Sequence, residues 1–130
     1  MAPEQKDILL KDLCGRLPYF VKVQIKNEIV VLNSICDDDG YHFNFIGDDR
    51  EGVNIEEIKP YLLPLSSMTE EQGKELEEID PEFYSLICGN GDIYVSMDVC
   101  GYDWLNKNHF DYRGLIEQGL AIDATGLNLY

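Results

Sequence analysis

The residues with the clearest chemical potential lie near the C-terminus, where an imidazole, a carboxylate, a phenol and a guanidinium fall within residues 109–113. A histidine oriented by a carboxylate can activate a thiol, so His109, Asp111 and a remote cysteine could form the site of a small cysteine/histidine hydrolase. No local nucleophile motif accompanies this histidine, however. We therefore favour a structural interpretation, in which Asp111 caps a helix, His109 binds backbone carbonyl groups and Arg113 pairs with an acidic side chain.

Carboxylates form a second group, in two glycine-containing turns and at the start of a predicted helix. Its members are Asp37, Asp38, Asp39, Asp48, Asp49, Glu70 and Glu71. Calcium needs several such oxygens, but an EF-hand loop starting at Asp37 would require glycine at its sixth position and glutamate at its twelfth. Those positions hold His42 and Asp48. We predict solvated turns rather than a metal site, and we interpret the carboxylates as candidate contacts for a basic protein surface.

The cysteines and glycines do not form a recognisable ligand set. The four cysteines stand at positions 14, 36, 88 and 100, too far apart in sequence for a CxxC pair. A zinc site is therefore not predicted, and free, buried thiols are expected. The run Gly89-Asn90-Gly91 matches neither a Walker loop nor a GxGxxG fingerprint, so we expect no nucleotide or other cofactor.

The charge of the chain limits the classes of partner. It carries 25 acidic and 10 basic side chains, a net charge of -15, and residues 34–98 hold 17 of the acids against Arg50, Lys59 and Lys74. Direct nucleic-acid binding is not expected, because contact with phosphates requires clustered Lys and Arg. Three interpretations remain open: a basic protein partner, mimicry of nucleic acid that inhibits a DNA- or RNA-binding protein, and solubility alone.

Length and composition indicate one folded domain over residues 1–130. Hydrophobic residues make up 45% of the chain, which is enough for a single core. No apolar run approaches membrane-spanning length and no export signal precedes the domain, so we expect a cytoplasmic protein that does not enter membranes. Nothing in the sequence indicates an oligomeric state.

Hydrophobic periodicity predicts an α+β fold that begins with a helix over residues 4–17. Alternating apolar positions then predict strands over residues 21–25, 41–45 and 53–55. The continuous β-branched run at 29–32 indicates a strand covered on both faces. We expect these four strands to form a small, strongly bent antiparallel sheet of the SH3-like kind.

The second half of the chain is predicted to contain a crossover, three helices and a hairpin. Pro60 and Pro64 bracket residues 61–63, so this segment should be extended or a single turn and serve as a crossover between the two halves. Thr69 and Gln72 have the spacing of a capping box, which predicts an acidic helix over 70–79. A hairpin is expected over 83–97, followed by two short helices, one over 99–108 and one capped by Asp111 that ends at Gly119. Residues 120–122 should be extended.

Three stretches of the chain carry a resemblance to a known group. They are IKPYLLPLSSMTEE at 58–71, DWLNKNHFDYRGLI at 103–116 and GLAID at 119–123. In these stretches the chain resembles small proteins of unknown function from gut Bacteroidales, their prophages and phages. The resemblance implies a cytoplasmic accessory protein of a mobile element, and it brings no catalytic residues with it. Residues 72–97 depart from the group.

Together these observations favour a non-enzymatic protein-binding accessory module of a phage or mobile element, which uses an acidic surface. The alternatives are the cysteine/histidine hydrolase and the nucleic-acid mimic. The hydrolase requires His109 and Asp111 to meet a cysteine, and the mimic requires acids spaced along one face at phosphate-like intervals.

Overall fold

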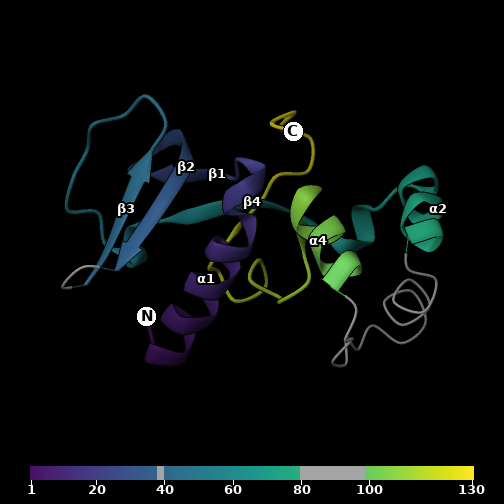
Figure 1. Cartoon of the computed structure of the whole chain (residues 1–130), viewed down its shortest axis with the longest axis horizontal. Coiled ribbons are helices and arrows are strands. Elements are labelled where there is room, and N and C mark those ends of the chain that lie inside the picture. The colour runs from purple at the N-terminus through teal and green to yellow at the C-terminus, as the bar shows by residue number, and fades with distance from the viewer. Residues whose placement is uncertain (38–39, 80–98) are drawn as a thin grey trace.

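The computed structural model describes residues 1–37, 40–79 and 99–130, and over these residues the chain is an α+β protein that begins with a helix (Figure 1). The helices are α1 (Pro3–Arg16), α2 (Glu70–Ile79) and α4 (Val99–Lys107), and the 3-10 turns are η1 (Leu17–Tyr19), η2 (Ile55–Glu57) and η3 (Leu65–Ser67). The strands are β1 (Lys22–Ile25), β2 (Glu28–Asp37), β3 (Tyr41–Phe45), β4 (Lys59–Pro64), β5 (Phe110–Asp111) and β6 (Ile122–Asp123). The predicted fold class and first helix are confirmed. The predicted hairpin over 83–97 lies outside the described residues.

The sheet is mixed, with strand order β3-β2-β1-β4-β5 and with β6 also paired to β4. The first four strands in this order pair antiparallel, whereas β5 and β6 run parallel to β4. This differs from the wholly antiparallel sheet that we predicted, and an SH3-like barrel is not shown. A strand can run parallel to its neighbour only if a long connection brings the chain back to the same end of the sheet. The connection from β4 to β5 contains α2 and α4.

Two segments expected in the bent sheet also differ from the prediction. Residues 53–55 form no strand but run from a loop into η2. In β2 the register shifts between Leu32 and Ser34, so Leu32 faces the core before the shift and Ile35 packs against the core after it. Val30 lies on the same face of β2 as Leu32. Ile29 lies on the opposite face and is 52% exposed. The β-branched run is therefore covered on one face, not on both.

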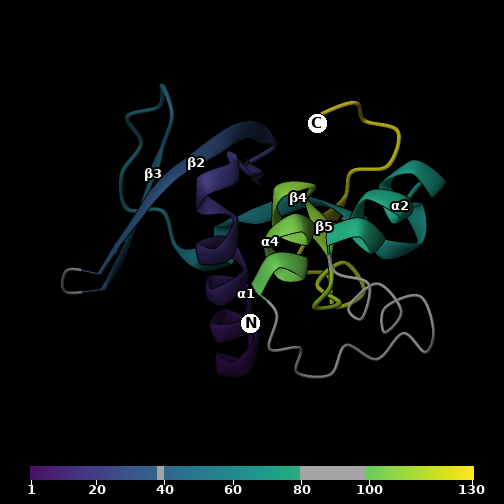
Figure 2. The same cartoon turned by 45° about the vertical axis from the view of Figure 1, so that its right-hand side comes forward.

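Among the described residues, the core consists of two clusters of buried side chains. In the larger one, Leu9 and Leu13 of α1 pack against the strands and against Leu115, and all three are fully buried. Figures 1 and 2 show α1 crossing the sheet at β1 and β4. In the smaller cluster, Leu76 of α2 packs with side chains of α4 and β5, among which the rings of Trp104 and Phe110 stack 5.7 Å apart.

Helix α2 begins as its sequence predicts. The Thr69 hydroxyl accepts a hydrogen bond from the Gln72 backbone N–H at 3.1 Å, and the Gln72 side-chain oxygen accepts one from the Thr69 N–H at 2.9 Å. This reciprocal pair is the capping box. Only Gly73 and Leu76 of the helix are buried, so most of its acidic face is in contact with solvent. Among the described residues, no helix combines the length and apolarity needed to cross a bilayer.

The end of the chain departs from the two predicted C-terminal helices. The first is confirmed as α4, with Trp104 and Leu105 buried. The second is only a turn over residues 115–119, where Leu120 N–H bonds back to the Leu115 carbonyl at 2.9 Å. Gly119, at a φ of 75°, ends the turn before a second helical turn can form. The extended residues that follow form β6.

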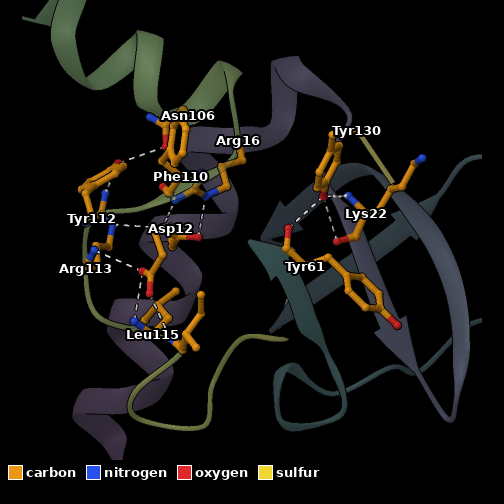
Figure 3. A network of polar contacts seen from close by, with 12 residues as sticks. Asp12, Arg16, Lys22, Tyr61, Asn106, Phe110, Tyr112, Arg113, Leu115 and Tyr130 are labelled. Atoms are coloured by element: carbon orange, nitrogen blue, oxygen red, sulfur yellow. Dashed lines mark hydrogen bonds and ion pairs between the residues drawn. The ribbon is translucent and has the colours of Figure 1, made fainter. Parts of the chain in front are cut away.

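A tyrosine at the end of the chain connects two strands that diverge. β1 and β4 pair only through Val23 with Pro60 and Gln24 with Lys59. Beyond these pairs the Tyr130 hydroxyl accepts a hydrogen bond from the Lys22 backbone N–H at 2.8 Å and donates one to the Tyr61 carbonyl at 2.9 Å (Figure 3). The phenol thus satisfies the backbone groups that a longer strand pair would satisfy.

We expect Tyr130→Phe to lower the free energy of unfolding by about 1–3 kcal/mol, because the Lys22 N–H and the Tyr61 carbonyl lose their partner. Urea denaturation measures this change. Tyr41→Phe is the matched control: Tyr41 is 52% exposed, and its hydroxyl has no hydrogen bond within the described residues. Equal stability of the two variants would show that the Tyr130 hydroxyl does not hold the strands together.

Candidate functional site

A buried ion pair on α1 organises the polar residues between α1, α4 and β5. Asp12 and Arg16 are both fully buried and stand one helical turn apart, on the face that also carries Leu13. The Arg16 guanidinium donates to the two Asp12 carboxylate oxygens at 2.8 and 3.0 Å and to the Phe110 carbonyl at 2.7 Å. Figure 3 shows this pair facing the 110–115 segment. It fixes β5 to α1.

A second arginine and a tyrosine complete the cluster. Arg113 approaches Asp12 to 3.3 Å, which confirms that Arg113 pairs with an acid. Its guanidinium also lies over the Tyr112 ring, 4.8 Å from the centroid, and donates to the Tyr112 hydroxyl at 3.1 Å. That hydroxyl in turn donates to the Asn106 side-chain oxygen at 3.0 Å. The cluster is thus bonded mainly to itself.

Asp111 caps a turn, as the structural interpretation predicts. One carboxylate oxygen accepts the Leu115 N–H at 3.0 Å and the Arg113 N–H at 3.3 Å, and the other accepts the Ile116 N–H at 3.0 Å. Both oxygens are therefore occupied by backbone donors, and the residue is buried. A carboxylate used in this way is not available to orient a histidine.

His109 lies in a different environment from the predicted one. Its ring is buried and stacks on the Tyr130 ring with centroids 3.6 Å apart, and its backbone has a φ of 63°. Within the described residues Nδ1 has no hydrogen-bond partner, so this nitrogen does not bind a backbone carbonyl as we had predicted. Burial, with smaller contributions from Arg16 and Lys22, lowers the pKa of His109 to about 4. The imidazole is neutral at physiological pH.

The hydrolase alternative gains no support from this geometry. No hydrogen bond joins His109 to Asp111 or to a thiol in residues 1–37, 40–79 and 99–130. Cys14 and Cys36 are free but exposed, which corrects the prediction of buried thiols: Cys14 follows Leu13 on the outer side of α1. Desolvation raises the pKa of Cys14, whereas an activated nucleophile needs a lowered one. The side chains of Cys88 and Cys100 lie outside the described part of the chain.

The predicted partner-binding carboxylates fall into separate places. Asp37 ends β2, and Asp48 and Asp49 lie beyond the opposite end of β3, whereas Glu70 and Glu71 form the first turn of α2. Figures 1 and 2 show β3 and α2 at opposite ends of the molecule. Asp38 and Asp39 lie outside the described residues. The candidates do not form a single row on one face, which the nucleic-acid mimic would need.

The carboxylates also differ in whether they are already paired. Asp48 binds the Arg50 guanidinium at 2.9 Å, and hydrogen bonds from Arg50 hold the pKa of that carboxyl below its usual value. Arg50 also reaches Glu28 at 2.7 Å. Exposed carboxylates without a hydrogen bond or ion pair in the described structure form the remaining set, which is Glu4, Asp37, Asp49, Glu51, Glu70, Glu71, Glu77, Glu78, Asp103 and Glu117. We call this set the unpaired carboxylates.

Half of the basic side chains form ion pairs within the molecule. Five of the ten form ion pairs with described carboxylates: Lys6, Lys11, Arg16, Arg50 and Arg113. The Lys22 ammonium donates to the Leu129 carbonyl. Few cations remain to offset the carboxylates at the surface. The acidic excess of the sequence is therefore also an excess of unpaired negative charge on the folded molecule.

Two further observations complete the description of the site. Across the described residues, no three side chains of His, Cys, Asp or Glu converge where a metal ion could bind. Compared with protein-family models, with curated proteins and with solved structures, the chain matches none of them.

Proposed function

We propose that this chain is a non-enzymatic binding module that engages a basic protein surface through its unpaired carboxylates. The observation that supports this proposal is the internal use of the basic side chains, which leaves Asp37, Asp49, Glu70 and Glu71 exposed and without a counter-charge. Such groups attract a cationic partner and stay hydrated until contact. They favour association because no internal ion pair has to be broken first. The setting in a phage or mobile element rests on the resemblance in residues 58–71 and 103–116.

Charge-neutralised variants test this proposal with an oligolysine peptide as the probe. Asp37→Asn with Asp49→Asn, and Glu70→Gln with Glu71→Gln, each remove two unpaired carboxylates. Because exposed charge contacts contribute about 0.2–1 kcal/mol each, we expect at least one of these double variants to bind about two- to tenfold more weakly. Isothermal titration calorimetry measures the affinity.

The control removes the same amount of charge from carboxylates that are already paired. Asp7 binds Lys11 at 3.1 Å and Glu56 binds Lys6 at 2.8 Å. Asp7→Asn with Glu56→Gln should therefore weaken peptide binding less than removal of unpaired carboxylates does. If all three double variants lose affinity equally, only net charge matters and the unpaired carboxylates are not a binding site.

A further inference from the structure

Within the described part of the chain, the strand β3 is an edge of the sheet and pairs with β2 on one side only. The Ile46 N–H bonds to the Val31 carbonyl at 2.9 Å. The extra residue of the register shift lies in β2, so the alternation along β3 continues from this bond. In an antiparallel pair, alternate residues direct their N–H and C=O groups away from the neighbour, and here these residues are Tyr41, Phe43 and Phe45. Phe45 is bridged to Asp48.

Tyr41 and Phe43 therefore present backbone donors and acceptors along an open edge. Among the described residues no strand pairs with this side of β3, and only the Phe45–Asp48 bridge lies there. An unpaired edge is a template for another strand, and proteins usually cover or shorten such edges. Here the following loop leaves space beside the strand instead.

A pocket lies along this edge. It has a volume of about 370 Å³ and is lined by four consecutive residues of β3, residues 41–44, and by residues 50–53 of the loop that follows the strand. Gly47 and Gly52, with φ of 67° and 69°, bound that loop and let the chain turn away from β3 and back. A wall formed by a strand edge on one side and a loop on the other suits an extended chain.

The charge around the pocket selects the chemistry of that chain. The loop carries Asp48, Asp49 and Glu51 against Arg50, whose guanidinium is held by Asp48 and by Glu28. Asp37, one of the unpaired carboxylates, ends the neighbouring strand β2 and pairs with Tyr41, at the other end of β3. Both ends of the edge are therefore negative, and an extended segment with lysine or arginine side chains is the complementary occupant.

We propose that the edge of β3 binds an extended, basic segment of a partner protein, which adds to the sheet as a further strand. The N–H and C=O groups of Tyr41 and Phe43 would form its backbone hydrogen bonds, and the carboxylates at the two ends would attract its cationic side chains. Main-chain bonds give affinity in this mode of recognition, and the side chains give specificity. This inference rests on the proposed function and assigns it a site and a class of partner.

A pair of peptides tests the inference without changing the protein. The first alternates lysine and valine, and the second has the same sequence with every backbone nitrogen methylated. Methylation keeps the charge but removes every N–H, so the second peptide cannot pair with a strand on either side. We expect the unmethylated peptide to bind about tenfold or more tightly, because at least two backbone hydrogen bonds separate the two complexes. The amide NMR signals of Tyr41 and Phe43 should shift with that peptide only.

Two double variants localise the binding. Asp49→Asn with Glu51→Gln should weaken binding of the unmethylated peptide, whereas Glu70→Gln with Glu71→Gln, far away on α2, should leave it unchanged. Equal affinity of the two peptides, or unchanged Tyr41 and Phe43 signals, would overturn the strand-addition inference while leaving the proposed function intact. If neither these peptides nor oligolysine bind, the proposed function is wrong as well.

Discussion

Asp12→Ala should destabilise this protein by about 3–5 kcal/mol, the usual cost of removing one partner from a buried ion pair. Asp12 is fully buried, accepts two hydrogen bonds from Arg16 and also forms an ion pair with Arg113. Without it, the buried Arg16 guanidinium has no counter-charge. The midpoint of urea unfolding measures the loss.

The same helix contains the control. Asp7 and Lys11 have the same spacing as Asp12 and Arg16, but about two thirds of each side chain is exposed. Asp7→Ala should therefore cost less than about 0.5 kcal/mol. A double variant, Asp12→Leu with Arg16→Met, should be more stable than Asp12→Ala, because it leaves no isolated charge. Similar losses for Asp7→Ala and Asp12→Ala would show that burial does not govern the Asp12 pair.

As the pH falls, protonation of His109 should destabilise the fold before most carboxylates are protonated. The pKa of His109 is about 4 in the folded chain, against an ordinary value of 6.5. Between these values the unfolded chain binds a proton that the folded chain does not, so stability is fully present above pH 6.5 and falls as the pH drops toward 4. The difference corresponds to a loss of up to about 3 kcal/mol at pH 4.

His109→Asn isolates this contribution. Asparagine does not titrate and tolerates the left-handed backbone of position 109. The variant should be less stable than the wild type at pH 7, because it loses the stacking on Tyr130. Its stability should then change less between pH 6.5 and 4. Parallel stability profiles of the two proteins over this range, measured by urea unfolding, would contradict the assignment.

The parts of the fold that follow from local sequence were predictable. The capping box at Thr69 and Gln72 forms within one turn, so the start of α2 could be predicted from residue spacing alone. β4 was expected only to be extended or a single turn. Its role as the strand that joins β1, β5 and β6 depends on residues far away in the chain, which no local pattern encodes. The register shift in β2 between Leu32 and Ser34 has the same origin.

In the candidate site, too, the local roles were predictable from the sequence and the long-range contacts were not. Asp111 was predicted as a cap because a carboxylate before a turn has a local role, and it has that role. Asp12 and Arg16 were missed because charged residues on a helix usually face solvent. A signal was present: both lie at helical spacing with Leu9 and Leu13, on the face that packs in the core. The stacking of His109 on Tyr130 joins residues 21 positions apart and had no such signal.

We propose that the unpaired carboxylates on the folded chain bind a basic partner. The salt dependence of oligolysine binding tests it most directly. Raising the salt concentration from about 0.01 M to about 0.15 M shortens the Debye length from about 30 Å to about 8 Å. We predict that the affinity of the wild type falls about tenfold or more over this range. The variant that combines Asp37→Asn, Asp49→Asn, Glu70→Gln and Glu71→Gln should bind more weakly at low salt and respond less. Binding that is independent of salt, or equal in the two proteins, would contradict the claim.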